Sequence, residues 1–336
     1  MSPATAGDLR ALARRLLSAS GVPEARAERT AEILVLAEAW GIASHGLMRL
    51  PHYLERLAAG GCRADAELTR VSDAGAVLVY DGAAGLGHWQ LWEAAEIARD
   101  RCASTGIAAV AVHDSSHCGA LGSYVYPALE AGLATVVFSN GPAAMPPWGG
   151  REPVLSTSPL AAGLPSTPRP VVIDLATSAV ARGRIAYHAQ QGLPLGEGWA
   201  FDADGTPTTD PHAALRGMLA PLGGGKGYAL AMLVEGLTAG LVGPALSADV
   251  PDMFDRADDA RPQGIAHLVV TLRPDAFGPG AEDRLSALTG RVDAAGGRTP
   301  GASRTRPADV HDDTPVDLAP STREGLRSWE IRLDVR

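Results

Sequence analysis

Residues 76–112 read AVLVYDGAAGLGHWQLWEAAEIARDRCASTGIAAVAV, and this stretch decides the fold class. Residues 76–80 form a short, valine-containing apolar run that predicts a strand, and residues 107–112 form a second one. Between them, residues 89–104 carry apolar side chains at helical spacing, which predicts a helix. Strands that alternate with helices in this way indicate an α/β lobe.

The same alternation continues towards the C-terminus. Further strands are predicted at 134–138, 171–175 and 266–272, and further helices at 119–131 and 227–241. After them, a late stretch rich in Pro, Gly, Arg and Asp, residues 293–320, predicts an extended surface arm.

Ahead of the α/β lobe, the pattern predicts three helices. The first covers residues 8–18, and the second covers 23–40, where Pro23 suits the first helical turn. The third covers 44–59, with Ser44 as its N-cap and two glycines after its end.

The composition is that of an ordinary soluble globular protein. The chain has 336 residues, enough for two lobes, of which 46% are hydrophobic and 20% charged. No apolar run reaches the roughly 18 residues that a membrane helix needs, and the first residues, 1–17, lack the apolar centre of a signal peptide. A formal net charge of −9 disfavours nucleic acid and anionic lipid as partners, but it does not exclude a small anionic substrate.

The three cysteines bear on the cellular compartment. Cys62, Cys102 and Cys118 are odd in number and far apart, and no CxxC pair occurs. This argues against a disulfide framework and against a structural zinc site, and it favours a reducing compartment. We therefore expect a cytoplasmic protein.

The segment SHGLMR at 44–49 is the first candidate site. If Ser44 caps a helix, His45 stands in the first turn and Arg49 one turn later on the same face. A 2-hydroxy acid needs a group that exchanges its hydroxyl proton and a fork that holds its carboxylate. Histidine and arginine supply these two functions. The positive end of the helix should lower the pKa of His45 and favour a neutral base. The simpler alternative is a second capping residue and a surface arginine.

The segment HDSSHCGA at 113–120 follows one predicted strand and precedes a predicted helix. Backbone N–H groups at the start of that helix would suit a phosphate or a carboxylate. His113 and His117 also have a spacing seen in metal sites, with Asp114 and Cys118 beside them. These residues are the basis of an alternative from a different class, a metal-dependent hydrolase. A polar turn without a ligand is the simpler interpretation.

Two further segments could contact a ligand. Residues 223–228, GGGKGY, contain Lys226, the only lysine among 29 basic residues, which suggests a chemical need for an ammonium group. The segment resembles a phosphate loop but has Gly227 where Ser or Thr would bind magnesium. Asp174 and Thr177 come at the end of a predicted strand, and ligands of α/β lobes bind at this edge of the sheet. The simpler alternative is that Asp174 only caps the next helix. The chain has no GxGxxG motif, which disfavours an ordinary Rossmann site.

Taken together, these segments resemble the malate/L-lactate dehydrogenase family of the second type. Its members include ureidoglycolate dehydrogenases, sulfolactate dehydrogenases and Δ1-piperideine-2-carboxylate reductases. The resemblance runs in order from about residue 37 to residue 300, and each motif is weak alone, whereas their shared order is specific. The motifs are SHGxxR at 44–49, HxG at 117–119, LSTSP at 155–159, DLATS at 174–178 with ARG at 181–183, EGW at 197–199, PTTDP at 207–211 and GGxKGY at 223–228.

The resemblance implies an α/β fold of the sulfolactate dehydrogenase kind, with a mixed sheet in three layers and no GxGxxG motif. It also implies a homodimer with active sites near the interface. We expect residues 1–72, completed by 305–336, to form a helical region for substrate binding and dimerisation. Residues 73–304 would then form an α/β cofactor-binding domain.

The resemblance also implies residue roles. Ser44 would orient His45, His45 would exchange the proton, and Arg49 would hold the carboxylate, with His117 as the alternative acid/base. Thr157, Arg182 and Gly183 would line the substrate pocket. The cofactor, NAD or NADP, would contact a larger set: His117, Cys118, Gly119, Ala120, Leu121, Asp174, Leu175, Ala176 and Lys226.

The sequence departs from the family pattern at three places. Cys118 stands where relatives usually have an aromatic residue, and Ser158 stands where they have Asn. Ala302 follows Pro300-Gly301, where relatives commonly have Glu. This late arm touches the adenosine end of the cofactor in relatives, and here its arginines could pair with a 2′-phosphate. They are Arg298, Arg304 and Arg306.

The function that these observations favour is NAD(P)-dependent interconversion of a small 2-hydroxy acid and its 2-oxo acid by hydride transfer, with His45 as acid/base and no metal. An alternative within the class is NADPH-dependent reduction of a cyclic imino carboxylate of the piperideine or pyrroline type, in which His45 would protonate nitrogen. The alternative from a different class is the metal-dependent hydrolase that uses His113 and His117.

Overall fold

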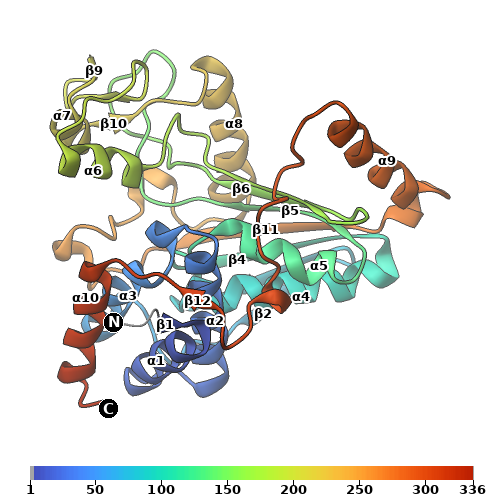
Figure 1. Ribbon diagram of the computed structural model, residues 1–336, viewed down its shortest axis with the longest axis horizontal. Helices are drawn as coiled ribbons and strands as arrows, with labels where there is room; N and C mark the ends of the chain where they lie inside the picture. The colour runs from blue at the N-terminus through green and yellow to red at the C-terminus, as the bar shows by residue number, and fades with distance from the viewer. Residues whose placement is uncertain (1–3, 336) are drawn as a thin grey trace.

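In the computed structural model, which describes residues 4–335, a seven-stranded sheet runs through the middle of the molecule (Figure 1). The strand order is β2-β3-β4-β11-β5-β6-β7, and only β3 and β4 are parallel neighbours. The strands are β2 (Thr69–Asp73), β3 (Val77–Asp81), β4 (Ile107–Ser115), β5 (Ala134–Ser139), β6 (Leu160–Leu164), β7 (Val171–Leu175) and β11 (Ile265–Leu272). The expected mixed sheet is confirmed.

Five of these strands lie where the sequence predicts them, whereas β2 and β6 were missed. Strand β2, TRVSD, is an edge strand that is exposed along its whole length, so it lacks the apolar pattern on which the prediction depended. Strand β6, LAAGL, consists of alanine, glycine and leucine rather than the β-branched residues that favour strands.

Helices cover both faces of the sheet (Figure 1). One face carries α4 (Gly87–Thr105), η3 (Leu121–Val125) and α5 (Tyr126–Leu129). The other face carries α8 (Gly225–Glu235) and the wider turn η4 (Gly236–Gly240) that continues it. The expected three-layer arrangement is therefore present, and apolar side chains such as Val110, Val137 and Val269 fill its core.

The two ends of the chain share a helical lobe (lower left in Figure 1). It contains α1 (Ala6–Ala19), α2 (Glu24–Ala39), α3 (Leu50–Ala59) and α10 (Pro320–Arg332). Strand β1 (Ala4–Thr5) pairs with β12 (Pro315–Val316), and one apolar core joins Leu16 and Leu34 to Leu326 and Trp329. The N-terminal helices therefore depend on C-terminal residues for their core.

A third, smaller lobe was not separated in the sequence analysis. It lies above the sheet in Figure 1 and contains α6 (Arg182–Gln191), α7 (Pro211–Arg216), β8 (Ala200–Phe201), β9 (Pro207–Thr208), β10 (Met218–Leu219) and the start of α8. Met145, Leu155, Ile185 and Ala231 form its own core.

The remaining elements are short turns and one helix that packs at the end of the sheet. They are η5 (Ser247–Asp249), η6 (Arg256–Asp258), η7 (Pro274–Phe277), α9 (Ala281–Ala294) and η8 (Pro307–Asp309). None of the helices described over residues 4–335 is long and apolar enough to cross a membrane.

The helix predicted at 44–59 is wrong in its first third. Two short turns, η1 (Ala43–His45) and η2 (Leu47–Arg49), precede α3. Gly46 separates them with φ −101° and ψ −144°, which is not helical, and a Cβ there would lie 2.7 Å from Oε1 of Glu38. The buried Glu38 carboxyl therefore occupies the space beside this break, and Ser44 is not the N-cap of one continuous helix.

Two other predicted helices have different bounds. The helix expected at 119–131 is reduced to η3 and α5, because Gly119 has a φ of +74°, which a helix does not allow. The helix expected at 227–241 begins earlier, at Gly225, and its regular part ends at Glu235.

A substitution at Gly61 tests how closely α3 approaches the loop at 259–261. A Cβ on Gly61 would lie 2.1 Å from the carbonyl oxygen of Asp259, so Gly61→Ala should destabilise the protein by roughly 1–3 kcal/mol. Gly290→Ala is the matched control, since nothing lies within 4 Å of its Cβ, and in the interior of α9 it should stabilise by about 0.5–1 kcal/mol. Urea unfolding measures both, and equal effects would contradict the close approach.

Candidate active site

Two histidines from different lobes face each other where the helical lobe meets the sheet. His45 lies in η1, and His117 lies in the loop after β4; their ring centroids are 5.9 Å apart and nearly parallel. Ser44 Oγ lies 2.9 Å from Nδ1 of His45. Within the described residues, Nε2 of His45 has no hydrogen-bond partner and is not a fully buried polar atom, so it is open to a ligand.

Hydrogen bonds to Nδ1 hold the ring of His117 in place. The backbone N–H of Gly119 donates to Nδ1 of His117 (3.3 Å), and the hydroxyl of Tyr53 lies 2.7 Å from the same atom. Because the amide can only donate, Nδ1 must be the unprotonated nitrogen, and Tyr53 donates to it as well. His117 therefore carries its proton on Nε2 when it is neutral.

Burial disfavours the charged form of both histidines. Burial lowers the pKa of His45, Asp174 partly opposes this shift, and Arg49 adds to it. The pKa of His117 lies well below its usual value, first because of burial and then because of His45 and other neighbouring cationic groups. The pKa of His45 falls as predicted, but the helix-terminus cause proposed from the sequence is replaced by burial, because η1 is a single short turn.

Arg49 is a partly buried cation beside this pair. Its Nε donates to the carbonyl of Ser44 (2.8 Å), which leaves its terminal nitrogens free, and no acidic side chain among residues 4–335 forms an ion pair with it. Burial lowers the pKa of the guanidinium, and the nearby Arg182 lowers it further. A partly buried cation without an acidic partner among these residues is suited to binding an anionic ligand.

The third lobe supplies the opposite wall. A Cβ on Gly183 would lie 3.5 Å from the Cβ of Ser44, so the start of α6 packs directly against η1. Arg182, at the first position of α6, lies 3.8 Å from the carboxylate of Asp252 and 5.7 Å from the ring centre of Phe254. Thr157 lies farther back, where its carbonyl accepts hydrogen bonds from Thr177.

The residues predicted to contact the cofactor form a second group beside the histidines. Cys118, Ala120 and Leu121 are buried, and Asp174 at the end of β7 lies close enough to influence the pKa of His45. Arg304 binds Asp174 (3.1 Å) and stacks on the Trp40 ring at 4.8 Å. A carboxylate that can accept from a ribose hydroxyl and a guanidinium that can bind a phosphate are the donor and acceptor types that a dinucleotide requires.

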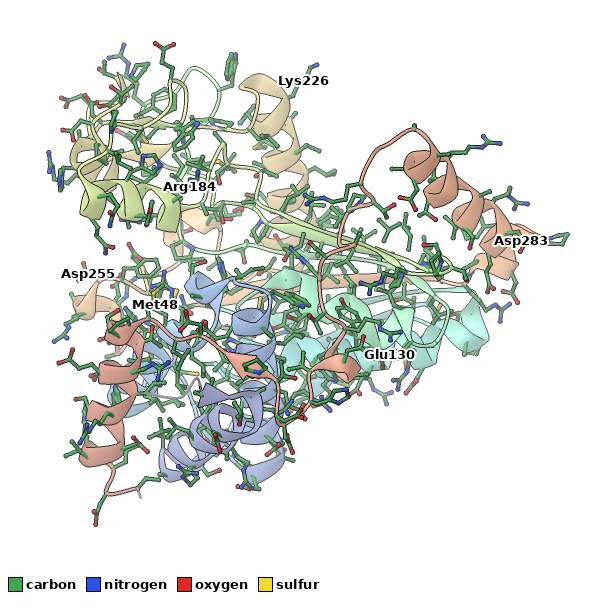
Figure 2. All side chains as sticks on the ribbon, viewed as in Figure 1. Met48, Glu130, Arg184, Lys226, Asp255 and Asp283 are labelled. Carbon is green, nitrogen blue, oxygen red and sulfur yellow. The ribbon has the colours of Figure 1, made fainter. Side chains whose placement is uncertain are left out.

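Lys226 and Arg298 do not lie in this group. Lys226 is exposed at the start of α8, and Figure 2 shows it on the far side of the third lobe from Met48, which lies in η2, the turn after the one that carries His45. Arg298 is exposed in the late arm, whereas Arg306 binds Asp309. Leu175 and Ala176 follow Asp174 at the partly exposed end of β7. The roles of Lys226 and Arg298 stay predictions.

His113 and His117, the two histidines that the hydrolase alternative requires, contact different partners and do not form one group of metal ligands. His113 binds Asp114 (2.8 Å) at the end of β4, whereas His117 binds Tyr53. Within the described part of the chain, His113 and Asp114 could meet a metal ion only together with Asp81. His117 and Cys118 are therefore not available to that set.

Sequence reasoning missed Tyr53 and Phe254. Tyr53 stands four residues after Arg49, so a helical reading of this segment could have placed both on one face. Phe254 lies about two hundred residues further on in an irregular segment, and no local pattern points to it.

A mixed sheet without a glycine fingerprint thus brings together two histidines and an arginine that has no acidic partner among residues 4–335, which is compatible with an oxidoreductase of small acids. Residues 4–326 match the family described as malate/L-lactate dehydrogenase, and the chain belongs to that family. It is 41% identical over 298 residues to the (2R)-3-sulfolactate dehydrogenase (NADP(+)) of Chromohalobacter salexigens, covering 87% of this chain and 88% of that protein.

Other relatives carry different names within the same class. The Δ1-pyrroline-2-carboxylate/Δ1-piperideine-2-carboxylate reductase of Pseudomonas putida is 36% identical over 95% of this chain and 94% of its own. Among solved structures, sulfolactate dehydrogenase from Methanocaldococcus jannaschii aligns with a TM-score of 0.90 at 28% identity, covering 99% of this chain and 98% of that one. The expected fold and enzyme class are confirmed.

The assignment of the His117 proton can be measured directly. We expect ¹⁵N spectra of the imidazole to show His117 neutral at pH 6.5, with its proton on Nε2, because Gly119 and Tyr53 both donate to Nδ1 and burial opposes the charged form. In Tyr53→Phe, one of the two donors is lost, so an Nδ1-protonated population should appear. A wild-type His117 protonated on Nδ1 would contradict this geometry.

Proposed function

We propose that this protein interconverts a small 2-hydroxy acid and the corresponding 2-oxo acid with NAD or NADP. The observation that carries the proposal is the partly buried Arg49, which lacks an acidic partner in the described chain and lies in the turn that follows His45. Such a cation fits a carboxylate, and the neighbouring histidine fits the proton that the adjacent hydroxyl must lose or gain.

The roles follow from which atoms are free. Arg49 holds the substrate carboxylate through its terminal N–H groups, because its Nε is already used by Ser44. Neutral His45 takes the hydroxyl proton at Nε2 during oxidation and returns it during reduction, while Ser44 orients its ring through Nδ1. His117, protonated on Nε2, donates a hydrogen bond to the same oxygen and does not act as the base.

A nicotinamide, when bound, accepts or supplies the hydride at C2 of the substrate. The residues that would hold the cofactor are His117 to Leu121, Asp174 to Ala176 and Arg304, since they combine a cation and a carboxylate with the loop of His117. The choice between NAD and NADP does not follow from these residues.

Reduction of a cyclic imino carboxylate is the second candidate. Several relatives bear that name, and the same Arg49 and His45 could hold the carboxylate and protonate the nitrogen. A screen of 2-oxo acids and cyclic imino acids with NADH and NADPH separates the two functions. We expect turnover of 2-oxo acids, and exclusive turnover of imines would reject the first proposal in favour of the second.

Two substitutions test the assigned roles. His45→Ala should lower kcat by roughly 100- to 10,000-fold, because a positioned acid/base is lost. Arg49→Lys should raise KM by roughly 10- to 150-fold with a smaller change in kcat, since a point charge replaces a bidentate fork. Steady-state kinetics measure both. A near-normal His45→Ala together with an inactive His117→Ala would assign the proton to His117 instead.

A homodimer and a cytoplasmic location are part of the same proposal. The helical lobe, in its described residues 4–72 and 305–335, exposes few large apolar side chains, whereas α8 exposes Leu230, Met232 and Leu233. We therefore propose α8 as the dimer interface, in place of the helical lobe. Lys226 at the start of α8 would then lie beside the partner. Three free, buried cysteines are compatible with the reducing cytoplasm.

Leu233→Glu tests this interface. A charge in the centre of an apolar contact should give a monomer in sedimentation equilibrium, because the carboxylate would lose its hydration without a partner. Ile331→Glu on α10 is the matched control, an exposed apolar residue outside the proposed interface. Dimers in both variants would exclude the α8 face.

A further inference from the structure

His88 is a buried histidine that the proposed reaction does not use. It stands in the first turn of α4 and has no exposed surface. Both ring nitrogens are buried, and neither has a hydrogen-bond partner among the described residues. Burial lowers the pKa of the imidazole to about 3, and His267 and His45 add to this shift. The ring is therefore a neutral polar group that makes no polar contact with the described chain.

Such a ring is an unfavourable way to fill buried space. A buried polar group without a hydrogen-bond partner costs free energy, whereas an apolar side chain of similar volume would not. A leucine in place of His88 would avoid this cost. The contribution of His88 must therefore lie in the shape of its ring and in the groups that pack against it.

The first of these groups is the ring of Tyr53. The ring centres of Tyr53 and His88 are 4.7 Å apart, and the planes meet at 76°, which is an edge-to-face contact. The hydroxyl of Tyr53 lies 2.7 Å from Nδ1 of His117, and these two rings are nearly parallel. His88 therefore limits the tilt of the ring that brings the hydroxyl to His117.

The second group is the backbone of Gly119. Its N–H donates to Nδ1 of His117 at 3.3 Å. A Cβ on Gly119 would lie 3.0 Å from Nε2 of His88 and 3.2 Å from the carbonyl oxygen of His45, so the edge of the His88 ring occupies the space beside this backbone. The two groups that donate to Nδ1 of His117 thus share His88 as a neighbour.

We propose that His88 is a positioning residue that keeps the His117 proton on Nε2. Its ring holds Tyr53 and Gly119 in the positions from which both donate to Nδ1. Because His88 is fully buried, it acts through these groups and does not reach the substrate. This inference rests on the proposed function, in which Nε2–H of His117 donates to the substrate oxygen. With the proton on Nδ1, Nε2 would present a lone pair to that oxygen, and the donor would be lost.

His88→Leu tests the proposal. Leucine fills a similar volume without unpartnered nitrogens, so the variant should fold and melt at the wild-type temperature or above it. Without the planar ring, Tyr53 and Gly119 lose their common support. We therefore expect ¹⁵N imidazole spectra to show an Nδ1-protonated population of His117 that the wild type lacks. With little change in KM, kcat should fall by about 3- to 30-fold, less than for complete loss of such a donor.

A double variant shows whether His88 acts through Tyr53. Tyr53→Phe already lacks the hydroxyl, so adding His88→Leu should lower kcat by less than about 3-fold more, through Gly119 alone. Leu91→Met is the matched control. Leu91 is equally buried in α4 but belongs to the apolar core of the sheet, whereas Tyr53 belongs to that of the helical lobe. This control should leave the His117 proton and kcat unchanged.

Three outcomes would overturn the inference. The first is a His117 proton that stays on Nε2 in His88→Leu. The second is the full loss of kcat, about 3- to 30-fold, in the Tyr53→Phe background, since His88 would then act independently of Tyr53. The third is a parallel fall of melting temperature and activity, which would make His88 a structural residue. A wild type without turnover of any 2-oxo or imino acid would overturn the proposed function, whereas the spectra would still decide the role of His88.

Discussion

His267 joins the three strands on which the active site rests. It lies fully buried on β11, and its ring nitrogens contact Ser139 of β5 (2.9 Å) and Ser115 of β4 (3.1 Å), with the carbonyl of Ser116 at 3.3 Å. Burial lowers its pKa to about 4, so the ring can make these contacts as a neutral group. Since β4 leads directly into the loop of His117, the position of the candidate catalytic group depends on this buried polar contact.

The site combines contributions that no single lobe could provide. The helical lobe supplies His45, Arg49 and Tyr53, the sheet supplies the loop of His117, and the third lobe supplies Arg182. Their shared property is burial, which lowers the pKa of both histidines and of Arg49, with Asp174 as the one acid that opposes the shift at His45. If the proposed function holds, an anionic substrate would offset this burial of positive charge, and acids would bind better than their neutral analogues.

Local chemistry explains which features were predictable. Strands β4 and β11 carry runs of largely buried apolar residues, so both could be predicted from the sequence, whereas the roles of Ser44, His45 and Arg49 stay predictions. The bend at Gly46 could not, because it depends on the Glu38 side chain of a different helix. Nor could the position of Phe254 beside Arg49 and Arg182, because it lies in an irregular segment about two hundred residues from Arg49. Lys226, predicted from composition, lies apart from the described site.

The strand order has a consequence for synthesis on the ribosome. Strand β11 is the last of the seven to be made, yet it lies between β4 and β5, and the helical lobe needs β12 and α10 to complete its core. The nascent chain therefore cannot mature one lobe at a time. Strands β4 and β5 must each wait with one open edge until β11 has emerged, which makes vectorial folding slow and exposes the chain to aggregation and to chaperone capture.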